Sequence, residues 1–318
     1  MELAALRGRR VTVVEVGPRD GLQNERTAVE TADKAAFVDM LSAAGLPVIE
    51  VSAFVNPKRV PHMADAAEVF TSITRRPGTR YTALVPNLAG LERAAAAGVE
   101  EIAIFAAASE SFSRANINRG IEDAFAAYAV VCARARDHRM RVRGYLSTAF
   151  GCPYEGAVSP DVVATLSARL LDMGVFQVAV SDTIGVAHPA QVAQVLDIVA
   201  KQVPLDTVAL HFHDTRGTAL ANVLTALALG VTTFDSSAGG LGGCPYAPGA
   251  AGNLATEDLV YMLDGLGIDT GVSLDRLADA SRFIETRLDH ALASRYAQAV
   301  RANQPKGWPA FTSGPGRW

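Results

Sequence analysis

Val208-Ala-Leu-His-Phe-His-Asp-Thr-Arg-Gly-Thr-Ala-Leu-Ala-Asn-Val-Leu-Thr-Ala-Leu-Ala-Leu-Gly230 joins a short apolar run to a longer run that is rich in Ala and Leu. The first run, 208–212, has the length of a buried strand, and the second, 218–229, has that of a helix. Gly230 stands where a helix would end, and a further run with β-branched residues follows at 231–235. The segment therefore predicts a strand, a helix and a second strand in succession.

The same alternation runs along most of the chain. The strand candidates are 11–16, 48–52, 81–85, 101–105, 142–147, 177–181, 208–212 and 231–235. The helix candidates are 31–44, 60–75, 88–97, 121–138, 160–173, 189–202 and 218–229, and an eighth starts near 253 and runs through 262. Eight strands that alternate with eight helices predict an α/β fold of the (β/α)8 TIM-barrel type. Periodicity leaves a doubly wound sheet open, but the sequence has no break near its middle, which favours one barrel.

A C-terminal extension follows the predicted barrel. We expect residues 1–266 to form the barrel and residues 267–318 to add a helical extension and a loosely ordered tail to the same domain. The helical region spans 273 to about 302, and the tail from 304 is rich in Gly and Pro. A length of 318 residues alone suggests about two domains, but α/β barrels of roughly this size are commonly single domains.

Composition narrows the functional classes. The net charge is −4 and 49% of the residues are hydrophobic, which argues against nucleic acid or a membrane surface as a partner. No run approaches the ~18 apolar residues of a membrane span, and the first ten residues are too few for a signal peptide. Cys132, Cys152 and Cys244 show no paired spacing, which is typical of a reducing compartment. We therefore expect an enzyme-sized chain that stays in the cytoplasm.

Ionisable side chains cluster where four predicted strands end, which is where TIM barrels place catalytic groups. The first strand ends in Glu15-Val-Gly-Pro-Arg-Asp-Gly-Leu-Gln-Asn-Glu25, and Glu50 lies near the end of the second. Asp182 follows the sixth strand, and His211 and His213 lie at the end of the seventh. The sequence therefore predicts a site at the mouth of the barrel.

His211 and His213 are the most informative pair. Residues two apart on a strand share a face, so both imidazoles can reach one ion. Inward positions of a barrel normally hold Val, Ile or Leu, although two satisfied core histidines remain the alternative. With oxygen ligands such as Asp20 and Asn253, the pair suits Mg2+, Mn2+ or Zn2+. Asp20 by itself could equally cap a turn, and the lack of a cysteine cluster argues against structural zinc.

Two further charged groups have a structural and a catalytic interpretation. Arg19 could form a simple ion pair with Glu50 at the end of the barrel. It could instead stabilise negative charge that develops during a reaction, with Glu50 orienting it. Asp182 could be a solvated loop carboxylate, or a general base or orienting group beside a metal.

The uncharged loop 237–253 contains six Gly, two Pro and Cys244. Long loops of this kind in compact domains are usually functional lids. Cys244 is its reactive group, although an inert thiol is an equally good interpretation of the loop alone. Cys132 lies in a helical pattern and indicates core packing, and Cys152 has no cationic neighbour that would activate it. Neither a P-loop nor a GxGxxG motif is present in the loop.

Three stretches resemble the 3-hydroxy-3-methylglutaryl-CoA lyases, which belong to the DRE-TIM metallolyases. They are Glu15 to Glu25, His211-Phe-His-Asp-Thr-Arg-Gly-Thr-Ala-Leu-Ala-Asn222 and Gly240-Leu-Gly-Gly-Cys-Pro-Tyr-Ala-Pro-Gly249. The resemblance covers roughly residues 11–299. The cysteine loop is its most specific part, because related condensing enzymes such as isopropylmalate and homocitrate synthases share the barrel and metal site but lack this loop.

The resemblance implies a role for each candidate residue. The implied metal ligands are Asp20, His211, His213 and Asn253. The implied catalytic residues are Arg19, Glu50, Asp182, His211 and Cys244, and the implied substrate-binding residues are Arg19, Gln23 and Asn116. The cofactor would be a divalent metal, with Mg2+ or Mn2+ favoured over Zn2+. The partner would be an acyl-CoA substrate, and we expect a homodimer or larger homo-oligomer.

The implied reaction is a retro-Claisen cleavage of 3-hydroxy-3-methylglutaryl-CoA, or a close 3-hydroxy-3-alkyl analogue, to acetyl-CoA and a 3-oxo acid. A base, His211 or Asp182, would remove the hydroxyl proton, Arg19 would neutralise the enolate and Cys244 would protonate it. Loop closure would keep water away, and the glycines would allow that movement. The alternatives are a metal-dependent aldolase or condensing enzyme acting on a 2-oxo acid, and a barrel that serves only as a scaffold.

The chain departs from the family pattern at several positions. Ala53 and Ala179 stand where the family commonly has Ser, and Ser181 where it has Gly. We therefore expect a slightly larger and less polar acyl pocket. Arg59 and His62 replace a Trp and a Gln, and Asp289-His290-Ala291 lacks a basic residue, which alters the expected coenzyme A contacts.

Overall fold

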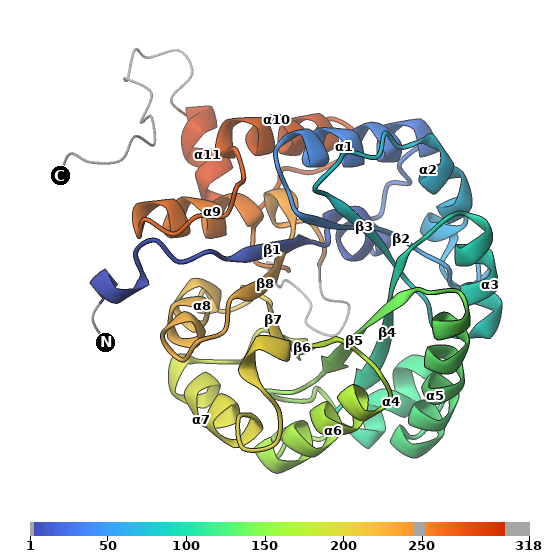
Figure 1. Ribbon diagram of the computed structural model, residues 1–318. Helices are drawn as coiled ribbons and strands as arrows, with labels where there is room; N and C mark the ends of the chain where they lie inside the picture. The colour runs from blue at the N-terminus through green and yellow to red at the C-terminus, as the bar shows by residue number, and fades with distance from the viewer. Residues whose placement is uncertain (1–2, 244–251, 303–318) are drawn as a thin grey trace.

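A closed barrel of parallel strands forms the centre of the molecule (Figure 1). The computed structural model describes residues 3–243 and 252–302. The strands are β1 Thr12–Glu15, β2 Val48–Ala53, β3 Arg80–Leu84, β4 Glu101–Ala107, β5 Arg141–Ser147, β6 Gln177–Asp182, β7 Val208–Phe212 and β8 Thr233–Ser236. β1 pairs with both β2 and β8, so the sheet has no edge. The predicted TIM barrel is confirmed, and the doubly wound alternative is wrong.

Helices surround the barrel in chain order. They are α1 Thr31–Ala43, α2 Ala66–Ser72, α3 Leu88–Ala96, α4 Glu110–Ile117, α5 Ile121–Asp137, α6 Pro160–Asp172, α7 Pro189–Val199, α8 Ala219–Ala228 and α9 Thr256–Gly265. Capping side chains define several starts, as at α6, where the Ser159 hydroxyl accepts a hydrogen bond from the amide of Asp161. One core of aliphatic and aromatic side chains fills the space between strands and helices.

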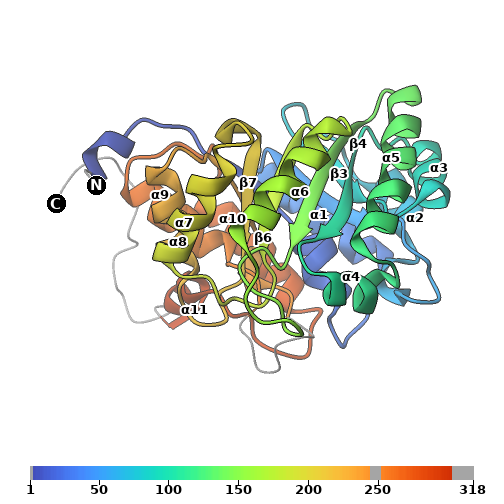
Figure 2. The ribbon, with the colours of Figure 1, turned by 90° about the horizontal axis from the view of Figure 1, so that it is seen from below.

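Two stretches differ from the predicted helices. The candidate at 60–75 is a 3-10 turn, Pro61–Met63, followed by the shorter α2, because Ile73 takes an extended backbone and ends the helix. α4 was not predicted, because its sequence is polar and lacks the Ala- and Leu-rich pattern of the other helices. α4 lies beyond the strands at one end of the barrel (Figure 2), and this end carries the carboxyl ends of the strands because α4 follows β4 directly.

The C-terminal region holds two helices where one helical region was expected. α10, Leu274–Glu285, packs against α1, and α11, Arg295–Ala302, packs against α9 (Figure 1). The predicted tail from 304 lies outside the described residues. None of the helices in the described part of the chain has the length and apolar character needed to cross a membrane.

Candidate active site

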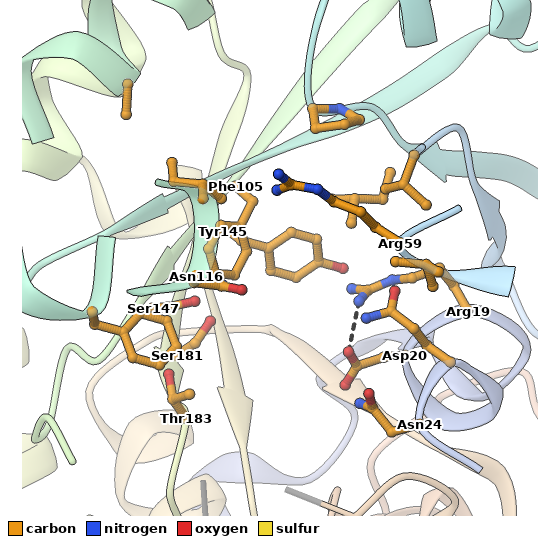
Figure 3. A pocket seen from close by; sticks show the side chains of 18 of the residues that line it. Arg19, Asp20, Asn24, Arg59, Phe105, Asn116, Tyr145, Ser147, Ser181 and Thr183 are labelled. Atoms are coloured by element: carbon orange, nitrogen blue, oxygen red, sulfur yellow. Dashed lines mark hydrogen bonds and ion pairs between the residues drawn. The ribbon is translucent and has the colours of Figure 1, made fainter. Parts of the chain in front are cut away.

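A cavity of about 550 Å³ opens at the carboxyl ends of the strands. Its lining includes Arg19, Asp20, Gln23, Leu84, Phe105, Asn116, Tyr145, Ser181, His211 and His213. Figure 3 shows Arg19 and Asp20 on one side and Asn116, Ser147 and Ser181 across from them. Four residues that the sequence placed at the ends of two strands therefore meet in one cavity: Arg19, Asp20, His211 and His213.

Arg19 is held between two carboxylates. It lies in a π-helical turn, Gly17–Gly21, that follows β1. Its Nε donates to Glu50 Oε2 at 2.5 Å, and its Nη1 donates to Asp20 Oδ1 at 2.6 Å. Burial disfavours the charge of Arg19, but Glu50 and Asp20 outweigh burial and raise the pKa of the guanidinium. Arg19 is thus a fixed, permanently charged group that also faces the cavity.

Asp20, His211 and His213 form a cluster of metal-ligand type. One ligand atom from each lies within 4.8 Å of the others. Burial would raise the pKa of Asp20, but Arg19 and the two histidines lower it to about 2, so the carboxylate is ionised. Burial and the neighbouring His211 lower the pKa of His213 to about 4, so this imidazole is neutral at pH 7. An ionised carboxylate and a neutral imidazole are the forms that bind a cation.

Asn253 completes the cluster from the far end of the cysteine loop. Its Nδ2 donates to Asp20 Oδ2 and to the carbonyl oxygen of Leu241, both at 3.0 Å. Its Oδ1 and the Nδ1 of His213 are buried, and neither has a hydrogen-bond partner within the described ranges 3–243 and 252–302. Buried polar atoms without partners are rare. An oxygen and nitrogen donor set of this kind fits a divalent cation such as Mg2+, Mn2+ or Zn2+.

The remaining candidates from the sequence are Gln23, Asn116 and Asp182, and they differ in whether they line the cavity. Gln23 and Asn116 both line the cavity, and Gln23 Oε1 is a buried acceptor with no partner in the described part of the chain. Asp182 is buried behind the lining, and its two oxygens accept the amides of Val186 and Ala187 at 2.9 Å each. Burial raises the pKa of Asp182 to about 6. Asp182 therefore lies outside the cavity lining, with its oxygens already engaged by backbone.

The expected widening of the acyl pocket at Ala53 and Ala179 stays a prediction. Both side chains are fully buried, and neither belongs to the cavity lining. Ser181 does line the cavity, so this departure adds a hydroxyl there.

Cys244 lies outside the described residues, but the two ends of its loop are described. The amide of Asn253 donates to the carbonyl oxygen of Gly242 at 3.2 Å, which ties these ends together. Gly252 has φ +77°, and a Cβ there would lie 1.7 Å from Gly242 O. Glycine at 252 is therefore required for close backbone approach. This differs from the expectation that the glycines serve loop movement.

Reasoning from the sequence missed three polar residues of the site. Tyr145 lines the cavity, and Arg19 lies 5.5 Å from the centroid of its ring. Asp235 contacts His211, and Arg143 pairs with Asp235. Tyr145 and Arg143 lie inside a predicted strand, where nothing distinguishes them from core or surface residues. Asp235 ends a predicted strand, and the rule that selected Asp182 could have found it.

Comparisons with known proteins agree with this geometry. A family model described as HMGL-like matches residues 10–284. The chain is 53% identical to the mitochondrial hydroxymethylglutaryl-CoA lyase of Rattus norvegicus, over 92% of this chain and 90% of that protein. It is 52% identical to a Pseudomonas aeruginosa protein named 3-hydroxy-3-isohexenylglutaryl-CoA/hydroxy-methylglutaryl-CoA lyase, over 92% of this chain and 98% of that protein.

A solved structure supports the same relationship. The crystal structure of hydroxymethylglutaryl-CoA lyase from Pseudomonas aeruginosa has a TM-score of 0.91 and 52% sequence identity, over 92% of this chain and 98% of that one. The resemblance seen in the motifs thus extends over nearly the whole chain and its three-dimensional structure. The chain belongs to the HMGL-like family.

Proposed function

We propose that the protein is a divalent-metal-dependent carbon–carbon lyase. Its substrate is 3-hydroxy-3-methylglutaryl-CoA or a close 3-hydroxy-3-alkyl analogue, and its products are acetyl-CoA and acetoacetate or the matching 3-oxo acid. The observation that carries this proposal is the position of Arg19. It is fixed by Asp20 and Glu50 beside the Asp20, His211 and His213 cluster, at the mouth of a barrel.

The proposed metal ligands are Asp20, His211, His213 and Asn253. Asn253 is included because its Oδ1 is buried without a partner in the described part of the chain. The ion, Mg2+ or Mn2+ in preference to Zn2+, would supply electrostatic polarisation of the substrate hydroxyl and fix its orientation.

The protein's own side chains divide the remaining work. A base removes the hydroxyl proton, and the C–C bond breaks to give the 3-oxo acid and the enolate of acetyl-CoA. The candidate bases are His211, which lines the cavity, and Asp182, which lies between the lining residues Ser181 and Thr183. Arg19 neutralises the enolate, Glu50 orients Arg19, and Cys244 protonates the enolate carbon. Gln23 and Asn116 contact the substrate from the cavity wall.

A branch larger than methyl at C3 is a second possibility that the cavity favours. Leu84, Phe105, Phe112, Ile117 and Tyr128 contribute an apolar section to its lining. Apolar surface of this kind stabilises a buried alkyl or alkenyl chain by about 0.8 kcal/mol for each CH2. The Pseudomonas aeruginosa relative is named for both a methyl and an isohexenyl substrate.

A substrate panel tests the proposal. Acetyl-CoA release is measured from 3-hydroxy-3-methylglutaryl-CoA and its longer 3-alkyl analogues with Mg2+ or Mn2+, and Cys244→Ser is the matched inactive control. We expect turnover without any 2-oxo acid, which separates the lyase from an aldolase or condensing enzyme. Equal rates for all chain lengths would contradict the apolar-branch proposal. No turnover together with no bound metal would favour the scaffold alternative.

We also propose a cytoplasmic location and a homodimer or larger homo-oligomer. Cys132 and Cys152 are buried free thiols, which is typical of proteins in a reducing compartment. Light scattering of the purified protein tests the assembly, and a mass near 33.4 kDa would contradict it.

A further inference from the structure

A buried ion pair crosses the interior of the barrel below the proposed metal site. Arg143 on β5 and Asp235 on β8 are 2% and 1% exposed. Arg143 Nη1 donates to Asp235 Oδ2 at 3.0 Å, and Nη2 donates to Oδ1 at 2.7 Å. This two-point contact fixes the plane of the Asp235 carboxylate, because the guanidinium is itself planar.

Asp235 also contacts a proposed metal ligand. His211 and Asp235 are direct neighbours in the pairing of β7 with β8, so their side chains lie on the same face. His211 Nδ1 lies 3.3 Å from Asp235 Oδ2. The other ring nitrogen, Nε2, lies 4.0 Å from Asp20 Oδ2 on the side of the cluster. Asp235 thus contacts the Nδ1 side of the imidazole ring, and the Nε2 side is directed at the metal-ligand cluster.

This contact determines the tautomer of the neutral imidazole. A neutral imidazole carries one N–H and one lone pair. The Asp235 carboxylate, paired with Arg143, acts only as an acceptor, so Nδ1 of His211 must donate. Nε2 then keeps its lone pair, which is the form that binds a cation. Carboxylates that accept the distal N–H of a ligating histidine fix its orientation and tautomer in many metal sites.

Stability alone does not account for the Arg143–Asp235 pair. Interior layers of TIM barrels are dominated by Val, Ile and Leu. Replacing a buried ion pair by apolar residues of similar volume is often neutral or stabilising. Arg143 is held further by Gln177, whose Oε1 accepts from its Nε at 3.0 Å and whose Nε2 donates to Thr233 Oγ1 at 3.3 Å. Residues of three strands, β5, β6 and β8, thus contribute to fixing one carboxylate.

We propose that Asp235, fixed by Arg143, is a positioning residue that orients His211 and sets its tautomer for metal binding. The inference rests on the metal-dependent function proposed above. Asp235 does not touch the substrate, so its effect appears first as metal affinity and only through that as activity.

Mn2+ binding to the full-length protein without substrate tests this role, with free Mn2+ measured by electron paramagnetic resonance. In Asp235→Asn an NH2 group in place of Oδ2 faces both Arg143 Nη1 and His211 Nδ1, and in place of Oδ1 it faces Arg143 Nη2. In either orientation Arg143 loses one of its two acceptors, so the side chain at 235 is no longer fixed. We expect Mn2+ to bind about 10–100-fold more weakly. Asp206→Asn is the matched control, because it makes the same chemical change at an exposed position in the 3-10 turn Leu205–Thr207, before β7 and away from the Asp235–His211 contact. We expect its Mn2+ affinity to equal that of the wild type.

A double variant keeps the test decisive if Asp235→Asn fails to fold. Arg143→Met combined with Asp235→Leu removes both charges of this pair and leaves His211 Nδ1 without an acceptor at position 235, and we expect it to fold and to bind Mn2+ as weakly as the single variant should. Wild-type affinity in a folded Asp235→Asn protein, or equal loss in Asp206→Asn, overturns the positioning role. A wild-type protein that binds no Mn2+ removes the proposed metal itself and this inference with it.

Discussion

Arg19 carries the positive charge on which the proposed chemistry depends. Replacing it in Arg19→Met keeps a side chain of similar length and removes the charge that would neutralise the enolate. Loss of a fixed group of this kind costs about 100- to 1,000-fold in kcat, and we expect at least that loss. Acetyl-CoA release measures the rate, and circular dichroism checks that the protein still folds.

Arg59→Met is the matched control for this change. Arg59 is an exposed arginine that lines the same cavity (Figure 3), so its replacement removes an equal charge from the same region. We expect a much smaller loss of rate. Near-normal turnover by Arg19→Met would remove Arg19 from the mechanism, and equal losses in the two variants would indicate a general effect of cavity charge.

Single residues of the site differ in how well the sequence predicts them. Arg19, Asp20, His211 and His213 could be predicted because polar side chains occupied strand ends where aliphatic residues are usual. Tyr145 could not be predicted, because a Tyr in an apolar strand has no distinguishing neighbour in the sequence. The contacts of such residues come from other strands and exist only after folding.

The ends of the cysteine loop show how one element constrains the metal site. In Gly252→Ala a Cβ would lie 1.7 Å from Gly242 O, at a backbone φ of +77° that L residues rarely adopt. The two ends must separate, and Asn253 moves with them. We expect weaker Mn2+ binding and a melting temperature lower by several degrees, since strained positions cost about 1–3 kcal/mol.

Gly243→Ala is the control at the same loop. A Cβ at Gly243 would meet no atom of the described residues within 4 Å, so we expect wild-type stability and Mn2+ affinity. Differential scanning calorimetry and Mn2+ titration measure the two effects. If Gly252→Ala behaved like Gly243→Ala, the close approach of the loop ends would have no bearing on Asn253.

Helices and strands were predictable wherever their periodicity was strong. The strand at 208–212 agrees with β7 at both ends, and the helix at 121–138 differs from α5 by one residue. The turn Gly17–Gly21, which holds Arg19 and Asp20, could not be predicted as a π-helix. Its shape depends on tertiary contacts, since a Cβ at Gly21 would lie only 2.7 Å from the Cβ of Leu241.

Closure of the barrel is a property of the whole chain that periodicity does not show. It depends on pairing between β1 and β8, which are separated by most of the sequence. Buried carboxylates form hydrogen bonds between elements near the β1–β8 pairing. Glu15 on β1 accepts the amide of Ala238 at 2.8 Å. Glu257 on α9 accepts the amide of Gly239 through both oxygens and the hydroxyl of Ser281 on α10.

These carboxylates make the stability of the whole molecule depend on pH. Burial raises the pKa of Glu257 from 4.5 to about 7, although hydrogen bonds oppose the shift. Between these two pH values, Glu257 therefore keeps a proton in the folded protein that it has released in the unfolded chain. Stability from this group is fully present below pH 4.5 and is lost as pH rises through 7. At about 1.4 kcal/mol for each pH unit, the loss approaches about 3 kcal/mol.

Glu257→Gln isolates this contribution, because Gln is neutral at every pH. We expect the variant to gain free energy of unfolding relative to the wild type as pH rises from 5 to 8, measured by urea unfolding at each pH. Glu68→Gln, at an exposed position on α2, is the control, and its difference from the wild type should stay flat. A constant difference for Glu257→Gln would mean that Glu257 keeps one protonation state throughout, and the pH dependence of folding would then have to come from other buried groups.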